Sequence, residues 1–270
     1  MNKKKTFRWI KIIVLLYCSI GIALYYLQEK FLFHPVTLAA DYTFDFKTPF
    51  EEVAIPLNSD ETINMVKFFS TDTITNGVVL YYHGNKQNIN RYAKFVNAFT
   101  KNGYEVWMPD YQGFGKSTGL RTEKKLNELA LQVYKMANAK FKNDNIIIYG
   151  KSLGTGIAAY AASVTNNKRL ILETPYYSIP SLFSCYAPIY PTTKMSTYKI
   201  PVNEYLGEVK YPITIFHGTD DGVIPYRNAS KLRNVLKPID EFITIENGTH
   251  HNLAEFDLYK KKLDSLLKLR

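Results

Sequence analysis

The stretch that decides the fold is NIIIYGKSLGTG, residues 145–156. Its first half is a run of β-branched and aromatic residues that ends at Gly150, a pattern typical of a strand buried on both faces. Residues 153–164 continue with helical spacing. Between them, Gly150, Ser152 and Gly154 predict a sharp strand-to-helix turn that lifts a serine hydroxyl above a sheet edge, where the helix dipole favours a developing anion. A plain turn with a serine N-cap is the alternative.

The same alternation of strand and helix extends over most of the chain. It predicts a doubly wound, mainly parallel α/β sheet, in which functional residues gather at the C-terminal ends of the strands. Residues 52–57 and 64–69 are expected to form a leading hairpin. Further strands are expected at 77–84, 105–110, 145–150, 169–175, 213–218 and 242–247, and helices at 90–101, 123–141, 153–164 and 252–267.

Residues 176–209 break this rhythm. The segment is rich in Tyr, Pro and Ser, and we expect it to form a short lid over the site. Its apolar side chains could line an acyl pocket, face a membrane, or pack the lid onto the core: Tyr176, Tyr177, Phe183, Tyr186, Ile189 and Tyr190.

The composition excludes several classes of protein. The 270 residues are enough for one sizeable core, and two Cys exclude a disulfide scaffold or a Cys-rich zinc module. The net charge of +10 raises the question of a nucleic-acid partner. Half of it lies in residues 1–30, where six basic side chains oppose Glu29 alone. We therefore interpret the basicity as a topology signal, with no nucleic-acid partner.

Residues 1–30 have the features of a membrane anchor. Residues 12–27 carry no charge, and as a helix they span about 24 Å; Trp9 and Ile10 extend this toward the roughly 30 Å of a hydrocarbon core. Lysines that precede the apolar stretch predict a single-pass anchor with a cytoplasmic N-terminus and the domain 31–270 on the opposite side. A cleaved signal peptide and a buried helix are the alternatives, although bulky residues stand where a signal peptidase needs small ones.

A catalytic serine needs a base, and the base needs an acid to orient it. Behind a serine elbow of this kind, the acid and then the histidine follow along the chain. FHGTDDGVIP follows the strand expected at 213–218, and NGTHHNL follows the strand expected at 242–247. Each segment offers a doublet, Asp220 with Asp221 and His250 with His251.

Together these segments resemble the α/β-hydrolase superfamily. HGTDDGVIP is similar to the family's acid loop, in which the acid is the fifth residue and precedes Ile-Pro by three, which implies Asp221. GTHHNL is similar to the family's G-x-x-H-N segment, which implies His251 as the base. The resemblance therefore implies a triad of Ser152, Asp221 and His251. His217 is expected to have a structural role at the strand end.

The resemblance also implies an oxyanion hole. HGN at residues 83–85 looks like the family's HG-x turn, so the backbone N–H of Asn85 is one expected donor, and that of Leu153 is the other. His83 is expected to support this loop, as is DYQGFGKSTG at 110–119, which is similar to D-x-R-G-x-G-x-S-x-G. That stretch lacks the spacing of a phosphate-binding loop. No metal-ligand spacing is present, so neither a metal nor a cofactor is expected.

The resemblance is closest to small membrane-anchored α/β-hydrolases that have a Q-x-x-x-x-F-x-P-like stretch after the anchor, here QEKFLFHP at 28–35. Such relatives are esterases, acyl-protein thioesterases or lysophospholipase-like enzymes. This implies a serine hydrolase that cleaves carboxylic ester or thioester bonds of a lipid or an acylated protein through an acyl-enzyme. A serine aminopeptidase-like peptidase and a non-catalytic hydrolase-like binding protein are the alternatives.

Overall fold

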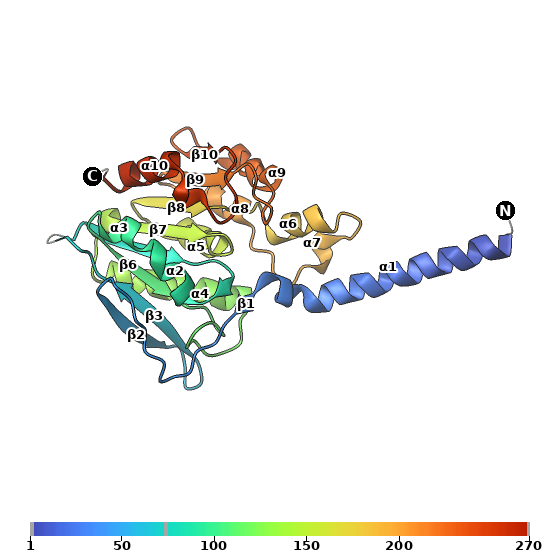
Figure 1. The fold of residues 1–270 in the computed structure, drawn as a ribbon, viewed down its shortest axis with the longest axis horizontal. Helices are drawn as coiled ribbons and strands as arrows, with labels where there is room; N and C mark the ends of the chain where they lie inside the picture. The colour runs from blue at the N-terminus through green and yellow to red at the C-terminus, as the bar shows by residue number, and fades with distance from the viewer. Residues whose placement is uncertain (1–2, 73–74, 269–270) are drawn as a thin grey trace.

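The computed structural model describes residues 3–72 and 75–268. A long N-terminal helix, α1 (Lys3–Leu32), extends away from an α/β domain (Figure 1). Most side chains of α1 are exposed, and the buried ones are Gln28 and Leu32, near its C-terminal end. Its 30 residues span about 45 Å at the rise of an α-helix. By length and composition, α1 could cross a membrane.

The core of the domain is an eight-stranded sheet with the strand order β10-β9-β8-β7-β4-β6-β3-β2. Its strands are β2 (Phe50–Pro56), β3 (Thr62–Phe68), β4 (Gly77–Tyr82), β6 (Tyr104–Pro109), β7 (Ile146–Lys151), β8 (Arg169–Glu173), β9 (Ile213–Gly218) and β10 (Glu241–Ile245). β3 pairs antiparallel with β2 and with β6, and all other neighbours in this sheet are parallel. The predicted hairpin and the mainly parallel α/β-hydrolase sheet are confirmed. A small second sheet pairs β1 (His34–Pro35) with β5 (Lys86–Gln87).

Helices cover both faces of the sheet because side chains of the central strands alternate between them. Ile146 and Ile148 of β7 belong to one apolar cluster, with α4, α5 and α8, and Ile147 and Tyr149 belong to the other, with α3 and α10. The helices are α2 (Ile89–Tyr92), α3 (Asn97–Thr100), α4 (Glu123–Asn138), α5 (Gly154–Ser163), α6 (Ile179–Tyr186), α7 (Thr192–Met195), α8 (Val202–Glu208), α9 (Tyr226–Ala229) and α10 (Asp257–Lys268), with 3₁₀ turns η1 (Ala93–Phe95), η2 (Asn143–Asn145), η3 (Ser230–Val235) and η4 (Leu253–Glu255).

Two predicted helices are interrupted in the structure. The helix expected at 90–101 is a series of three short turns, α2, η1 and α3. The helix expected at 252–267 begins instead at Asp257, because Phe256 has an extended backbone (φ −78°, ψ 135°) that separates η4 from α10. In both cases the apolar spacing is right. In the first segment the backbone stays in the helical region at Tyr92, Ala93 and Val96, but i→i−3 hydrogen bonds tighten it into 3₁₀-type turns, and in the second Phe256 leaves the helical region.

The segment 176–209 divides into two parts. α6, α7 and their connection, residues 179–195, project from the sheet and lie beside the C-terminal half of α1; we call them the lid (Figure 1). α8 returns to the body, where Val202 and Leu206 are buried in the helical layer over the sheet. The projecting lid is therefore shorter than the predicted segment.

Candidate active site

The serine lies on a strained turn between β7 and α5. Ser152 has a φ of 52°, in the left-handed region that residues other than glycine rarely adopt. A Cβ atom on Gly154 would lie 2.0 Å from the carbonyl oxygen of Tyr82, and one on Gly150 would lie 2.6 Å from that of Gly154. Both flanking positions therefore require glycine, and the predicted strand-to-helix turn is confirmed.

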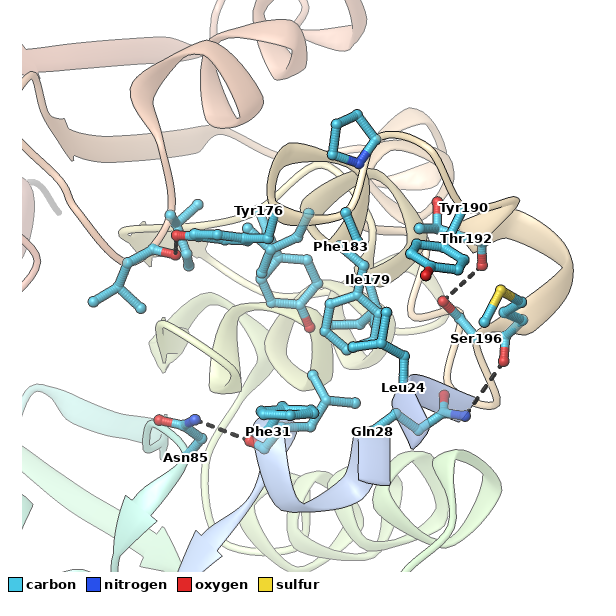
Figure 2. Close-up of a pocket in the computed structure, with 18 of the residues that line it drawn as sticks. Leu24, Gln28, Phe31, Asn85, Tyr176, Ile179, Phe183, Tyr190, Thr192 and Ser196 are labelled. Atoms are coloured by element: carbon cyan, nitrogen blue, oxygen red, sulfur yellow. Dashed lines mark hydrogen bonds between the residues drawn. The ribbon is translucent and has the colours of Figure 1, made fainter. Parts of the chain in front are cut away.

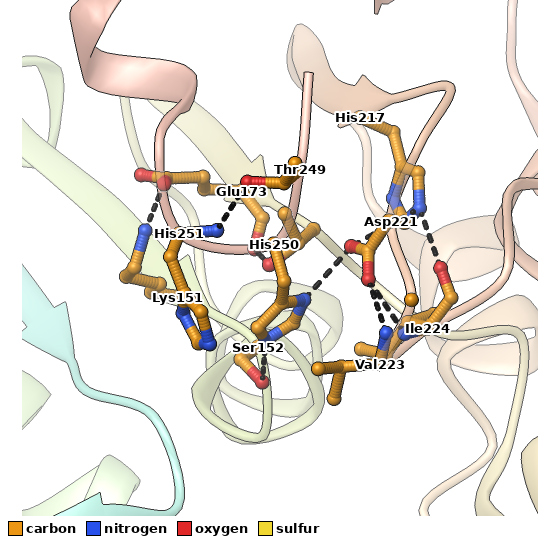
Figure 3. A network of polar contacts seen from close by, with 12 residues as sticks. Lys151, Ser152, Glu173, His217, Asp221, Val223, Ile224, Thr249, His250 and His251 are labelled. Carbon is orange, nitrogen blue, oxygen red and sulfur yellow. Dashed lines mark hydrogen bonds and ion pairs between the residues drawn. The ribbon is translucent and has the colours of Figure 1, made fainter. Parts of the chain in front are cut away.

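One histidine connects this serine to an acid at the end of β9 (Figure 3). Nε2 of His250 lies 2.9 Å from Oγ of Ser152, and Nδ1 of His250 lies 2.8 Å from Oδ2 of Asp221. The other carboxylate oxygen of Asp221 accepts the N–H groups of Val223 (2.8 Å) and Ile224 (2.7 Å). The acid is thus held by its own loop, and it orients the histidine toward the serine.

The prediction that His251 occupies this position is wrong. After β10, Asn247 turns the chain with a φ of 58°, and Oδ1 of Asn252 accepts the N–H of Thr249 (2.7 Å). In this tight turn the rings of His250 and His251 stand at 82° to each other, so only His250 points at Asp221. His250 is buried and His251 is exposed. The prediction relied on His251 being followed by Asn252, as in the family's His-Asn pair. The direction in which each imidazole ring points depends on the conformation of the folded loop.

The acid remains ionised although it is buried. Burial alone would raise the pKa of Asp221, but the hydrogen bond and charge of His250, the N–H of Ile224 and the nearby His217 outweigh it, so the pKa lies below its ordinary value. His217 has Nε2 2.9 Å from the carbonyl oxygen of Ile224 and 3.5 Å from Asp221, and burial lowers its pKa. Its predicted structural role in the acid loop is confirmed.

The expected oxyanion loop lies against the serine. Asn85 and Leu153 line the same cavity as Ser152. The backbone N–H groups of Asn85 and Leu153 donate to no carbonyl elsewhere in the described part of the chain. The Asn85 carbonyl accepts from the N–H of His34 (2.8 Å), and its side chain donates to the carbonyl of Leu32 (2.9 Å), so the end of α1 holds this loop.

Two motifs support the loop from behind. Nδ1 of His83 contacts the carbonyl of Gly84 (2.7 Å), and Nε2 contacts Oδ1 of the buried Asp110 (3.1 Å). Gly115, in the glycine-rich turn, has a φ of 53°, and a Cβ there would lie 2.1 Å from the Asp110 carboxylate. Both expected supporting roles are confirmed.

A buried charge cluster that no sequence motif predicts lies beside the serine. The ammonium of Lys151 contacts the carboxylate of Glu173, and both side chains are almost fully buried. Glu173 also accepts the hydroxyls of Tyr149 and Tyr259. Burial would raise the pKa of Glu173, but the charge and hydrogen bond of Lys151 and the two hydroxyls lower it on balance. The sequence around Lys151 does not indicate that its ion-pair partner, Glu173, lies on the neighbouring strand β8.

An apolar pocket of about 920 Å³ opens at the serine (Figure 2). One wall comes from the lid, and the other comes from α1, with Ile20, Leu24 and Phe31 among its residues. The six apolar side chains predicted to line a pocket or pack on the core do both. Tyr176, Tyr177 and Phe183 pack on the core, and five of the six line the pocket: Tyr176, Phe183, Tyr186, Ile189 and Tyr190. The volume lies at the upper end of the range for small-molecule sites.

The strand order, the strained serine elbow and the acid and histidine beyond neighbouring strands define the class of protein. The chain belongs to the α/β-hydrolase superfamily. Within the described residues, no group of three or more His, Cys, Asp and Glu side chains is placed to hold a metal ion.

Comparisons with known proteins agree with this class. Residues 73–200 match the family model described as serine aminopeptidase, S33. The chain is 29% identical over 204 residues to human protein ABHD12B (66% of this chain, 56% of that protein) and 29% identical over 186 residues to the rat lysophosphatidylserine lipase ABHD12 (61% and 46%). It therefore spans about half the length of these curated relatives. An esterase of Pyrococcus furiosus, Pf2001, shares the fold with a TM-score of 0.67, at 18% identity over 88% of this chain and 97% of that one.

Proposed function

We propose that this protein is a membrane-anchored serine hydrolase that cleaves the ester or thioester bond of a long-chain acyl group through an acyl-enzyme. The observation that carries the proposal is the unbroken chain of contacts from Ser152 through His250 to Asp221, at the base of an apolar pocket. Because nucleophile, base and orienting acid are all within hydrogen-bond reach, the constellation meets the geometric requirement for nucleophilic catalysis.

In the proposed reaction, Oγ of Ser152 attacks the acyl carbonyl as Nε2 of His250 accepts its proton. The negatively charged oxygen of the tetrahedral intermediate accepts the N–H groups of Asn85 and Leu153. The carbonyl carbon's bond to the leaving oxygen or sulfur then breaks, and His250 donates its proton to the leaving alcohol or thiol. Water, deprotonated by His250, attacks the acyl-serine, which releases the carboxylic acid and restores Ser152. Asp221 stays ionised and stabilises the imidazolium throughout.

The apolar pocket supports a long-chain acyl group. Its walls come from the lid and from α1, so an acyl chain bound at Ser152 would lie between these two elements (Figure 2). The rings of Tyr17 on α1 and Tyr190 on the lid stack with centroids 4.7 Å apart, and each hydroxyl donates to a backbone carbonyl of the other segment. Ile189, at the tip of the lid, is 70% exposed.

The position of these contacts supports delivery of the substrate from the membrane. Tyr17 lies in the middle of the uncharged stretch 12–27, so in a spanning α1 the lid tip would reach the bilayer. An acyl chain could then pass from lipid into the pocket without crossing water. In the proposed topology the N-terminus is cytoplasmic, as the lysines before the apolar stretch indicate, and the hydrolase domain lies on the opposite side.

The alternative functions receive less support. An aminopeptidase needs an acidic group to hold the free amine of its substrate, and no Asp or Glu is among the described residues that line the apolar pocket. A non-catalytic binding protein has no use for a strained serine aligned with a histidine and an acid. Ester or thioester cleavage is therefore the function that this site favours.

The test is fluorophosphonate labelling of the detergent-solubilised full chain, together with hydrolysis of p-nitrophenyl esters of increasing acyl length. We expect labelling and turnover in the wild type, loss of both in Ser152→Ala, and a preference for long chains. Ser163→Ala is a matched control, because that hydroxyl lies at the far end of α5 and donates to the carbonyl of Tyr160. A folded wild type that neither labels nor turns over an ester would refute the proposal.

A further inference from the structure

A second, smaller cavity meets the apolar pocket at the serine. It has a volume of about 290 Å³, and Phe31, Asn85, Ser152 and Val223 line both cavities. Its remaining walls come from β1, β5, α2 with η1, the end of β7 and the loop after β10. Its side chains are mostly cationic or imidazole groups, so we call it the basic pocket: His34, Lys86, Arg91, Lys94, Lys151, His250 and His251.

The positive charge of the basic pocket is largely uncompensated. Lys151 is neutralised by Glu173, behind the wall. By contrast, Lys86, Arg91 and Lys94 have no carboxylate within salt-bridge distance in the described part of the chain. No Asp or Glu is among the described residues that line the cavity.

The positive charge of the basic pocket affects the pKa of the exposed His251. Partial burial lowers its pKa, and the neighbouring His250, Lys86, Lys151 and Arg91 lower it further. Three cations that converge on a small hollow without a counter-ion repel one another, and a bound anion would remove that cost. The lining of the basic pocket therefore offers positive charge that a bound anion could neutralise.

The position of His250 assigns this cavity to the leaving group. His250 lines the basic pocket and is absent from the lining of the apolar one, whereas Leu153 lines only the apolar pocket. In the proposed mechanism His250 donates its proton to the leaving alcohol, so that alcohol must lie on the His250 side. The acyl chain then occupies the apolar pocket, and the rest of the substrate occupies the basic pocket.

We infer that the basic pocket binds an anionic group, a phosphate or a carboxylate, carried on the alcohol part of the ester, so that the substrate is an acyl lipid with an anionic head group. This inference rests on the proposed function for the direction of the substrate. Arg91 carries a planar guanidinium suited to two oxygens of one anion, and Lys86 and Lys94 in the same lining supply point charges.

The experiment compares three lipids with the same oleoyl chain: lysophosphatidic acid, lysophosphatidylcholine and monooleoylglycerol, in neutral detergent. For the wild type we expect kcat/KM to be highest for lysophosphatidic acid. Arg91→Gln/Lys94→Gln should lower that value by about ten- to a hundredfold and leave monooleoylglycerol within about twofold. Lys124→Gln/Lys142→Gln removes the same charge from exposed positions elsewhere and should change neither. High salt should reduce the preference.

A binding measurement separates this inference from the proposed hydrolysis. Ser152→Ala protein should bind lysophosphatidic acid more tightly than monooleoylglycerol, and the Arg91→Gln/Lys94→Gln change should remove the difference, whether or not the wild type is an esterase. Equal affinity for the two lipids, or an equal loss for both in the double variant, overturns the anionic subsite. If the double variant lost turnover of an S-acyl peptide but kept turnover of lysophosphatidic acid, the inference of an anionic lipid head group would be overturned in favour of a protein substrate.

Discussion

The choice between two adjacent histidines can be tested with a pair of single substitutions. His250→Ala removes the contacts to Ser152 (2.9 Å) and Asp221 (2.8 Å) together, so the serine loses its base and the acid loses the partner of one carboxylate oxygen. His251→Ala removes an exposed side chain that contacts neither. The two variants have the same composition, which makes each the control of the other.

The size of the expected effect follows from the role of the base. General acid–base catalysis contributes about 10²–10⁴, and loss of a triad histidine costs more, because the serine is then no longer activated. We expect kcat/KM for p-nitrophenyl butyrate to fall by at least about 10⁴ in His250→Ala, which corresponds to a barrier at least about 5.4 kcal/mol higher. For this ester, with a neutral acyl chain and no anionic head group, His251→Ala should stay within about twofold of the wild type.

The assay is initial-rate hydrolysis in detergent together with the rate of fluorophosphonate labelling, and thermal unfolding establishes that both variants are folded. If His251→Ala lost activity while His250→Ala retained it, the assignment of the base would be refuted, and the loop after β10 would have to present the other ring to Asp221. Equal and large losses in both variants would show that the two rings act together, contrary to the single chain of contacts.

Three further outcomes follow from the packing and the charges. Gly154→Ala places a Cβ 2.0 Å from the carbonyl oxygen at the end of β4 and should cost about 1–3 kcal/mol with loss of labelling, whereas Gly207→Ala, with no atom within 4 Å, should be tolerated in the same unfolding scan. Gly21→Leu forces Tyr190 off α1, since a Cβ there lies 3.0 Å from its ring; turnover of a long-chain ester in vesicles should fall about three- to tenfold, with p-nitrophenyl butyrate unchanged. Glu173→Gln leaves the buried Lys151 without its counter-ion and should lower the free energy of unfolding by about 3–5 kcal/mol near neutral pH. Because the folded pKa of Glu173 is lowered, its stabilisation is present above the unfolded pKa and is lost as pH falls through the folded pKa; the melting temperatures of variant and wild type should therefore converge in acid.

Local pattern was enough for the scaffold. The buried run before Gly150, the helical spacing after Gly154 and the two flanking glycines identified the serine elbow, and the structure shows that a Cβ at either glycine would overlap the backbone. The sequence also pointed to Asp221, and the structure places its carboxylate against His250; the loop after β9 holds it through the N–H groups of Val223 and Ile224, two and three residues on. Such features depend on neighbours close in the chain.

The features that only the tertiary structure decided depend on residues far apart in the chain. Whether His250 or His251 reaches Asp221 depends on the conformation of the loop after β10. The position of a residue in a motif does not determine where its side chain points. Lys151 finds its ion-pair partner, Glu173, on the adjacent strand β8. The walls of the apolar pocket form only because α1 and the lid, which are more than 150 residues apart in the sequence, contact each other in the fold. The sequence by itself determined the scaffold and the serine elbow, because strand and helix periodicity and steric limits are local. The histidine that contacts Ser152 and Asp221, the two pockets and their opposite characters were decided by packing, because they exist only where distant segments come together.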